Sequence, residues 1–435
     1  MNLSTQSLQT ALESLVGTRV RPAEDEDVVS GVHPQFVVEP GNEEEVAAVL
    51  SLADKEGLRV VVRGGGTQLS LGSQPAGADL LLSTARLNQI IEHVPHDLTV
   101  TVEAGLPLVT LQEALAKANQ WLALDPDLDP AATIGGIIAT NATGPRRLRY
   151  GGVRDQIIGV RVVLADGTIA KGGGKVVKNV AGYDLPKLFT GSLGTLGVIV
   201  SATFRLYPLP AASRTVYLTS SALTSLCDLS LQITSSTLVA TALTIEGKTS
   251  QPDIYHMAVR FETSPEAAED QATTLIEMAT SKSGDIIQTP QVFKDEAEGQ
   301  IWSQMLHHTS LPDDSHRRLA LKVSVLPTEL ARWLTALEQV CQRLQLEADW
   351  LAHAGHGLVF VDLAGDETAL KTAVTELRQR AIEHRGSVVV TEASPYLAAQ
   401  LDVWGPVSGL EVMRNLKARF DPHTVLNPGR FVGGI

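Results

Sequence analysis

Apolar and polar residues follow one another along the first half of the chain in short patterns that predict both helices and strands. Residues 43–56 have helical spacing, with Asn42 as the N-cap, glutamates in the first turn and Gly57 at the end. The β-branched run that follows predicts a strand. Further elements are expected in "ADLLLS", "LTVTVEAG", "VTLQEALAKANQWL" and "VRVVLADGTIAKGG", where Asp166-Gly167 indicates a type I′ hairpin turn. The mixture, without a regular βαβ rhythm, predicts an α+β fold.

The later half has a more regular order of elements. From "RRLALKVSVL" onward the pattern predicts a strand, a helix over 327–344, strands through "LEADWLAHAGHGLVFVDLAG", a helix over 366–384 and a strand in "SVVVTEAS". This order is typical of a ferredoxin-like β-α-β-β-α-β unit. Trp333 and Cys341 lie on the apolar stripe of the first helix, so we expect them in the core. The Pro- and Ala-containing stretch at 208–215 predicts the boundary between the halves.

Charge and cysteine content narrow the function classes. The formal net charge of −14 argues against nucleic acid as the main partner, because such binding depends on Lys and Arg. Cys227 and Cys341 are far apart, which argues against a disulfide framework, an iron–sulfur motif and a cysteine zinc site. The N-terminus lacks the features of a secretory signal and no apolar run is long enough for a membrane span. The expected location is cytoplasmic, with peripheral attachment to the inner face of the plasma membrane through a partner left open.

Three glycine-rich segments carry the candidate chemistry. The first, "VVVRGGGTQLSLG", runs from a strand into three consecutive glycines, and the others are "ATIGGIIATNATG" and "FTGSLGTLGVIV". Bare glycine backbone can hold a phosphate, although a tight turn explains a single cluster equally well. Neither GxxxxGK[ST] nor GxGxxG after a strand is present, which argues against a P-loop or Rossmann site. Three such segments, otherwise apolar, predict one long ligand with phosphates and rings.

These segments, in this order and with the C-terminal "RFDPHTVLNPGRF", resemble the PCMH-type FAD-binding domain of the vanillyl-alcohol oxidase superfamily. Within it, "TGPRRLRYGGVRD" followed by "GGGKVVKNVAGYDLPKLFTGSLGTLGV" is most similar to the FAD-binding subunits of bacterial glycolate oxidases, of the GlcE type. The resemblance implies four parts: an N-terminal helical segment (1–30), an FAD domain of two α/β subdomains (31–210), a ferredoxin-like cap (211–415) and a C-terminal segment returning to the FAD domain (416–435).

The resemblance also implies which residues hold the cofactor. The pyrophosphate would lie on the first glycine loop, the flavin beside the second segment and the adenosine near the third, and a β-carbon in place of these glycines would clash with FAD. Thr67 stands where some members have a histidine bonded to the flavin, so non-covalent FAD is expected. The implied FAD-binding residues are Arg63, Gly64, Gly65, Gly66, Thr67, Gln68, Thr133, Gly135, Gly136, Asn141, Gly144, Gly191, Ser192, Gly194, Thr195, Gly197 and Val198.

Oxidation of a 2-hydroxy acid needs a base for the hydroxyl proton and cations for the carboxylate. The histidine pair in "LAHAGHGLVFVD" offers His356 as a flavin-side group, whereas His353 is expected to be a core or turn histidine. Tyr183 and Asp184 either lie near the flavin or pack the subdomain junction. The candidate cations, each of which could equally form a structural or surface salt bridge, are Arg146, Arg147, Arg154 and Lys178. His356, Arg146 and Tyr183 are the resulting catalytic candidates.

The same histidine stretch departs from a metal-binding pattern. Related FAD dehydrogenases for hydroxy acids carry HAGDGNLH here, with two histidines that bind a divalent metal. In this chain His356 replaces the aspartate, Leu358 the asparagine and Phe360 the second histidine, and "TEAS" around Glu392 lacks the GEHG that completes such a site. One histidine and a distant carboxylate coordinate a hard cation poorly, so no metal is expected.

The resemblance implies an FAD-binding subunit of a glycolate oxidase complex, which would oxidise glycolate or a related 2-hydroxy acid such as D-lactate to the 2-oxo acid. Because the chain has no cysteine motif for a cluster, electrons would leave through an iron–sulfur subunit, and a second FAD subunit is implied as well. Two alternatives stay open. One is an accessory subunit that holds FAD while a partner performs the chemistry, and the other is a free-standing FAD-dependent alcohol oxidase.

Overall fold

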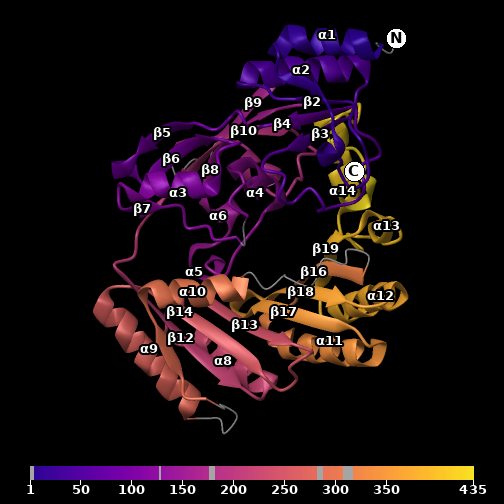
Figure 1. Cartoon of the computed structure of the whole chain (residues 1–435). Helices are drawn as coiled ribbons and strands as arrows, with labels where there is room; N and C mark the ends of the chain where they lie inside the picture. Colours follow the sequence, from indigo (N-terminus) through magenta and orange to yellow (C-terminus); the bar gives the residue numbers. More distant parts are fainter. Residues whose placement is uncertain (1–3, 127–128, 176–181, 282–287, 307–316) are drawn as a thin grey trace.

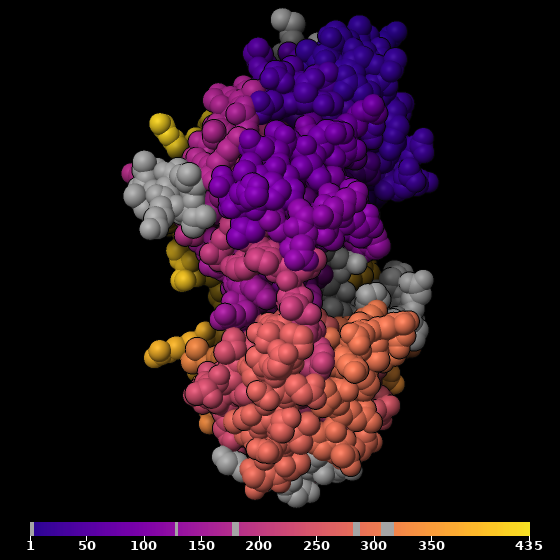
Figure 2. Space-filling view, turned by 90° about the vertical axis from the view of Figure 1, so that its left-hand side faces the viewer, coloured from indigo at the N-terminus to yellow at the C-terminus, as the bar shows by residue number. Residues whose placement is uncertain are grey.

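The computed structural model describes residues 4–126, 129–175, 182–281, 288–306 and 317–435, which form two bodies. The N-terminal body contains the chain up to residue 210 together with the C-terminal segment, and the cap contains most of the remaining chain (Figure 1). Figure 2 shows the two bodies stacked one above the other. Helices and antiparallel strands occur in both bodies, so the predicted α+β class is confirmed.

The first subdomain of the N-terminal body is a four-stranded sheet covered by two helices. The predicted helix α2 is confirmed, because Asn42 Oδ1 accepts a hydrogen bond from the Glu45 amide at 2.8 Å and Gly57 ends the helix in the left-handed conformation at φ 68°. The sheet has the order β1-β2-β4-β3, and β4 runs parallel to both its neighbours. Its elements are α1 (Thr5–Val16), β1 (Val20–Pro22), β2 (Phe36–Val38), α2 (Glu43–Glu56), β3 (Val60–Arg63) and β4 (Leu80–Ser83).

The second subdomain has a five-stranded antiparallel sheet of order β5-β6-β10-β8-β9. The predicted hairpin at Asp166-Gly167 is confirmed, but its turn is not type I′, because only Gly167 has a positive φ (89°) and the loop closes between Leu164 and Thr168. The elements are β5 (Ile90–Val94), β6 (Thr99–Glu103), α3 (Leu108–Ala116), β7 (Gln120–Trp121), α4 (Ile134–Thr140), α5 (Arg147–Tyr150), α6 (Val153–Gln156), β8 (Ile157–Val163), β9 (Ile169–Gly173), α7 (Leu185–Phe189), β10 (Val198–Arg205) and β11 (Tyr207–Pro208).

The cap contains an antiparallel sheet in which eight strands of the described chain follow the order β15-β12-β14-β13-β17-β18-β16-β19. The predicted β-α-β-β-α-β unit is confirmed as β16-α11-β17-β18-α12-β19. The preceding stretch, β12-α8-β13-β14-α9-β15, repeats the same order of elements and the same strand arrangement, which the sequence pattern does not reveal. The two ferredoxin-like units join through β13 and β17, so the cap is a pair of related halves sharing one sheet.

The bounds of the cap elements are β12 (Ala212–Ser220), α8 (Leu223–Ser235), β13 (Ala242–Lys248), β14 (Tyr255–Thr263), α9 (Pro265–Thr280), β15 (Gln291–Phe293), α10 (Asp295–Leu306), β16 (Arg318–Ser324), α11 (Leu330–Leu344), β17 (Glu347–His353), β18 (Leu358–Ala364), α12 (Glu367–Glu383) and β19 (Ser387–Ala393). The main core of the cap lies between the sheet and the helices α8, α9, α11 and α12. The opposite face of the sheet, here called the inner face, is turned toward the N-terminal body (Figure 1).

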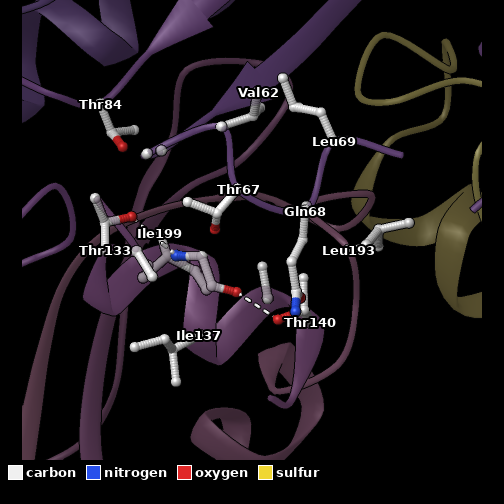
Figure 3. Close-up of a pocket in the computed structure, with 18 of the residues that line it drawn as sticks. Val62, Thr67, Gln68, Leu69, Thr84, Thr133, Ile137, Thr140, Leu193 and Ile199 are labelled. Atoms are coloured by element: carbon white, nitrogen blue, oxygen red, sulfur yellow. Dashed lines mark hydrogen bonds between the residues drawn. The ribbon is translucent and has the colours of Figure 1, made fainter. Parts of the chain in front are cut away.

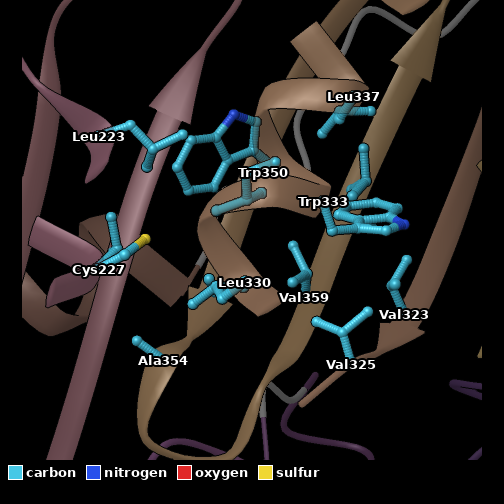
Figure 4. Close-up of a cluster of buried hydrophobic side chains, with 14 of the residues drawn as sticks. Leu223, Cys227, Val323, Val325, Leu330, Trp333, Leu337, Trp350, Ala354 and Val359 are labelled. Carbon is cyan, nitrogen blue, oxygen red and sulfur yellow. The ribbon is translucent and has the colours of Figure 1, made fainter. Parts of the chain in front are cut away.

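Trp333 and Cys341 of α11 lie in the cap core, as predicted, and Cys227 of α8 lies there too. Trp333 is 1% exposed and Trp350 is fully buried, and Figure 4 shows them with Cys227 and Leu330 between the helices and the sheet. Burial raises the pKa of the Cys227 and Cys341 thiols to about 12. Protonated and inaccessible, these thiols serve as small apolar core groups.

The C-terminal segment returns to the N-terminal body through α13 (Pro395–Ala398) and α14 (Leu410–Phe420). Leu426 forms a β-bridge with Val60 of β3. The buried Lys417 ammonium donates to Asp421 at 2.6 Å and to the carbonyl oxygens of Thr195 and Leu426, both at 2.9 Å. This fully bonded charge pair joins the segment to the third glycine-rich loop, and so fixes one wall of the site described next.

Candidate functional site

A cleft of two connected pockets runs from the N-terminal body to the cap. The first pocket, with an empty volume of about 800 Å³, lies between the loop after β3, helix α4 and the loop before β10 (Figure 3). The second, of about 1720 Å³, extends to the inner face of the cap sheet. Thr67, Gln68, Thr140 and Leu193 line both pockets. A single long ligand can therefore extend through both.

The first glycine loop is shaped mainly by the second glycine-rich segment. A β-carbon at Gly64 would lie 2.3 Å from Thr133 Oγ1, and one at Gly65 would lie 1.7 Å from the Ala131 carbonyl oxygen. Gly135 is restricted likewise, since an added β-carbon would lie 2.8 Å from that of Ala104. These clashes are with protein. At these three positions the protein itself requires glycine, and their contact with the cofactor stays a prediction.

Other glycines do leave bare backbone at the pocket. Gly66 takes a φ of +78° and has no neighbour closer than 3.7 Å to an added β-carbon. At Gly136 the nearest atom would be Thr133 Oγ1 at 3.4 Å, and at Gly191 it would be the Asn141 β-carbon at 3.4 Å. All three line the cleft. They are the positions where a ligand has the closest access to the main chain.

Most of the predicted cofactor residues lie together. Thr67 and Gln68 project from the first loop toward α4, where the Thr140 hydroxyl donates to the Gly136 carbonyl oxygen at 2.8 Å (Figure 3). The predicted residues that line the first pocket are Gly64, Gly65, Gly66, Thr67, Gln68, Thr133, Gly135, Gly136, Gly194, Gly197 and Val198, and Gly191 lines the second. The three glycine-rich segments therefore meet at one cleft.

Arg63, one of the predicted cofactor residues, does not line either pocket. The Arg63 Nη1 donates to the Asp27 carboxylate at 2.8 Å, and neither residue of this ion pair lines a pocket. Asp27 is also bound by both terminal nitrogens of Arg21, and these bonds above all lower the pKa of the Asp27 carboxyl to about 2. The carboxylate holds the start of the glycine loop through Arg63.

Four more predicted residues also lie outside the linings of both pockets. Asn141 ends α4 in the left-handed conformation at φ 50°. A β-carbon at Gly144 would lie 1.6 Å from the Asp125 carbonyl oxygen. Ser192 and Thr195 are buried, and the Thr195 hydroxyl donates to the Ser192 carbonyl oxygen at 2.7 Å. These residues shape the loops that form the pocket.

Two residues of the C-terminal segment line the first pocket and are absent from the predicted set. The Asn427 side chain donates to the Leu193 carbonyl oxygen at 2.9 Å. The guanidinium of Arg430, which is 3% exposed, donates from Nη2 to the carbonyl oxygens of Leu69 at 2.6 Å and Leu71 at 2.9 Å. Its Nε has no hydrogen-bond partner among the described residues, and burial lowers the pKa of Arg430 to about 10. A buried guanidinium without a carboxylate favours an anionic ligand.

In the second pocket, His353 and not His356 faces the cavity. His353 is 2% exposed, and neither ring nitrogen has a hydrogen-bond partner among the described residues. Burial, with a smaller effect of His356, lowers the pKa of His353 to about 3. The ring is therefore neutral at working pH, and it packs beside Phe360 at 5.1 Å between centroids.

Lys322 of β16 lines the same pocket. It is partly buried, and within the described chain its ammonium makes no ion pair or side-chain hydrogen bond. Burial, together with the positive charge of Arg147, lowers its pKa. Asp362 also lines this pocket, but its carboxyl is bound to Arg318 at 3.0 Å and burial raises its pKa to about 6. The cavity therefore presents a lysine without an ion-pair partner in the described chain beside a neutral histidine, and Glu392 lines it as well.

The other catalytic candidates lie outside the linings of both pockets where the structure describes them. His356 does not line the pocket, and burial together with nearby Arg147 lowers its pKa to about 4. Arg146 is bound to Glu262 at 2.6 Å across the junction between the two bodies. Tyr183 is 93% exposed, and Arg154 is exposed as well. Asp184 caps α7, and Lys178 lies outside the described residues. Among the described residues of this set, proximity in sequence to the glycine segments does not bring the side chains into the lining of the cleft.

Comparison with known proteins identifies the family. The family model of the FAD binding domain matches residues 34–173, and that of the C-terminal domain of FAD linked oxidases matches residues 229–431. Glycolate oxidase subunit GlcD of Bacillus subtilis is 30% identical over 426 residues, which cover 91% of this chain and 88% of that protein. The chain belongs to the FAD-linked oxidases.

Other relatives of this FAD-linked oxidase have similar coverage. A D-2-hydroxyglutarate dehydrogenase of Xanthomonas citri is 29% identical over 92% of this chain and 89% of that protein, and a D-lactate dehydrogenase of Archaeoglobus fulgidus is 29% identical over 91% of each. Among solved structures, 4-ethylphenol oxidase from Gulosibacter chungangensis has a TM-score of 0.72 at 18% identity and covers 99% of this chain and 97% of that one. At this identity the likeness supports the fold alone.

The cleft of this FAD-linked oxidase fits FAD. The dinucleotide is long and anionic in its middle, and the first pocket offers bare backbone at Gly66 and Gly136 and the buried, carboxylate-free Arg430. Those residues would hold the pyrophosphate side, which leaves the flavin end at the second pocket beside the cap. Within the described residues, no three His, Cys, Asp or Glu side chains form a cluster that could hold a metal ion.

Proposed function

We propose that this FAD-linked oxidase oxidises a small 2-hydroxy acid, such as glycolate or D-lactate, to the 2-oxo acid at its own flavin. The observation that carries the proposal is the pair formed by Lys322, which has no ion-pair partner in the described chain, and the buried, unbonded His353 on the wall of the second pocket. Relatives named as a glycolate oxidase subunit and as D-lactate and D-2-hydroxyglutarate dehydrogenases support this substrate class.

Lys322 is proposed to bind the substrate carboxylate. A cation in a partly buried pocket gains more from an anion than one in water, because the local dielectric is low. Lys322 faces the cavity between Phe360 of β18 and Val389 of β19, its neighbours in the sheet. The carboxylate would supply the ion-pair partner that Lys322 lacks in the described chain, and so orient the adjacent carbon.

His353 is proposed to accept the hydroxyl proton. With a pKa of about 3 the imidazole is neutral, so a ring nitrogen has a free lone pair at working pH. Bound FAD supplies the acceptor for the hydride from the α-carbon. Transfer of the hydroxyl proton to His353 and of a hydride from the α-carbon to bound FAD would convert the 2-hydroxy acid to the 2-oxo acid.

The subunit type and the partners are part of the proposal. The motif at 143–155 and the replacement of the second metal-binding histidine by Phe360 support a GlcE-type subunit, although the matched subunit is GlcD. With only two cysteines, both in the cap core, electrons are proposed to leave through an iron–sulfur partner, in a complex with a second FAD subunit. Such a partner would also provide any attachment to the inner face of the plasma membrane. Within the described chain, no helix is long and apolar enough to cross a membrane.

The isolated holoprotein tests the proposal. We expect glycolate or D-lactate, added without oxygen, to bleach the oxidised flavin absorption. Flavin that stays oxidised with both acids but is reduced when the partner subunits are added would favour the accessory role. Reduction followed by rapid peroxide formation in air, without partners, would favour a free-standing oxidase.

A further inference from the structure

A chain of buried charges crosses the junction between the two bodies. Arg146, in the loop before α5, binds Glu262 of β14 through Nη2 at 2.6 Å and through Nε at 3.1 Å. The Arg146 amide donates to the Asp125 carboxylate at 3.1 Å. Arg260, two residues before Glu262 in β14, donates to Glu298 of α10 at 2.9 Å. Two residues of the N-terminal body and three of the cap thus form two neighbouring groups, Asp125–Arg146–Glu262 and Arg260–Glu298, which affect each other through their charges and are here called the network.

Two tryptophans and two hydroxyl groups complete this network. The Arg146 guanidinium lies over the Trp121 ring at 4.8 Å, and that of Arg260 lies over Trp302 at 4.5 Å. Ser213 and Thr215 donate to Glu298 at 2.7 and 2.6 Å. The Glu262 side chain is only 3% exposed. Charge pairs with this degree of burial and bonding have one geometry, because any other leaves an unpaired ion away from water.

The network lies next to the substrate pocket. Leu148, two residues after Arg146, packs against the cap core, and a β-carbon at Gly355 would lie 2.6 Å from its Cδ1. Gly355 belongs to the turn that follows His353 in β17. The side chain of the intervening Arg147 lowers the pKa values of both His353 and Lys322 by its charge, a smaller effect than burial. Segment 146–148 is therefore packed against the turn that follows the proposed base, His353.

We propose that Arg146 is a positioning residue, whose forked pair with Glu262 sets the cap against the FAD domain so that His353 and Lys322 face the flavin end of the cleft. The inference rests on the proposed function for its catalytic consequence. It replaces the sequence-based role of Arg146 as a substrate-binding cation. The pair requires an arginine at position 146, because its Nε and Nη2 both donate to the Glu262 carboxylate, whereas a lysine has only one side-chain nitrogen.

The test compares single and double substitutions in the holoprotein. Arg146→Met and Glu262→Met each leave one buried charge unpaired, so loss of stability is expected from either alone. The double variant removes both charges and replaces them with flexible apolar side chains, so its Tm should return toward wild type. If Arg146 positions the cap, the limiting rate of flavin reduction by D-lactate in the double variant stays at least about tenfold below wild type, because small misplacements of catalytic groups cost large factors in rate. A double variant that recovers both Tm and rate would overturn the proposal.

A second readout is independent of substrate. Amide hydrogen exchange of residues 353–357 should be faster in the double variant than in wild type, whereas the exposed control Arg154→Lys should match wild type in exchange and in reduction rate. Unchanged exchange in 353–357 would contradict the positioning role. If wild type itself is not reduced by either acid, the proposed function fails, while the exchange result still decides whether the Arg146–Glu262 pair fixes this loop.

Discussion

The two pockets of the cleft are built in different ways. The first is formed largely by main chain of the three glycine-rich segments: Gly64 and Gly65 of the first segment leave no room for a side chain against the second, whereas Gly66 and Gly136 leave bare backbone at the pocket. The second is formed by side chains that antiparallel strands bring to one sheet face, with Lys322 opposite Phe360 and His353 opposite Leu358. We therefore expect FAD binding to depend on main chain that glycine leaves bare. The proposed substrate chemistry should depend on strand register, which decides which side chains face the pocket.

The largest expected effect is on the cap side. His353→Asn should lower the limiting rate of flavin reduction by about 10²- to 10⁴-fold, the range that a positioned general base contributes. FAD content should stay near the wild-type value, because the groups proposed to hold the pyrophosphate side, Gly66, Gly136 and Arg430, line the first pocket and His353 does not. His356→Asn is the matched control, since it alters the other histidine of the turn, and its rate should stay within about threefold of wild type. Stopped-flow absorbance measures both, and the reverse ranking would assign the chemistry to His356.

The next largest effect is expected in the first pocket, where Gly136 leaves bare backbone and Gly65 is packed against protein. Gly136→Val adds a side chain where only Thr133 is near, so we expect a folded protein whose FAD affinity falls by about 10- to 100-fold, as overpacking costs about 1–3 kcal/mol. Gly65→Val should instead destabilise the fold, because its β-carbon would lie 1.7 Å from the Ala131 carbonyl oxygen. Flavin content and the Tm of the apoprotein distinguish the two. A Gly136→Val protein with full FAD affinity would contradict the assignment of this wall.

The pH dependence sharpens the role of His353. An ordinary histidine base of pKa about 6.5 would lose about 30-fold in rate at pH 5, through protonation. Because the pKa of His353 is lowered to about 3, the reduction rate should stay nearly constant from pH 8 to 5. Asp362, in the same pocket with a pKa of about 6, also titrates in this range, so the profile is measured in Asp362→Asn as well. An acid limb near pH 6.5 that persists in Asp362→Asn would contradict a neutral, buried base.

The smallest effect concerns the junction. Burial raises the pKa of the Asp125 carboxyl to about 7, against the effect of Arg146. The folded state then binds a proton that the unfolded state has released, so the contribution of Asp125 to stability falls as pH rises through 7. Arg146, Arg260 and Glu262 are the charged groups that face it. Between pH 6 and 8.5 the Tm of wild type should fall more than that of Asp125→Asn, by about 1–2 °C. Equal slopes would show that Asp125 does not titrate in this range.

Much of the fold follows from local sequence. The N-cap and C-terminal glycine of α2, the amphipathic α11 and the second ferredoxin-like unit are encoded within short stretches, and the structure confirms them. The glycine segments also indicate the cofactor cleft, because glycine is required where the main chain lies too close to its neighbours for a side chain. The first ferredoxin-like unit was not predicted, since no composition break separates its strands from the loops around them.

The substrate side was less accessible to sequence, although one signal was present. Trp350 and Ala352 of β17 face the cap core, so strand alternation places Leu351 and His353 on the inner face, and His356 falls in the turn beyond. That periodicity favours His353 over His356. Arg146 offered no such signal, because its partner Glu262 is 116 residues away in sequence and belongs to the other body. Ion pairs of this kind are determined by tertiary structure alone.

Lys322 is proposed to bind the carboxylate of a 2-hydroxy acid beside the flavin in the second pocket. The most direct measurement is the visible difference spectrum of the oxidised holoprotein titrated with oxalate, a non-oxidisable analogue, in wild type and in Lys322→Met. We expect a saturable change of the flavin spectrum in wild type. In Lys322→Met the affinity for oxalate should be weaker by about 10-fold or more, since a hydrogen bond to a charged group contributes about 1.5–3 kcal/mol. Equal affinities in the two proteins, or no perturbation of the flavin in wild type, would contradict this role of Lys322.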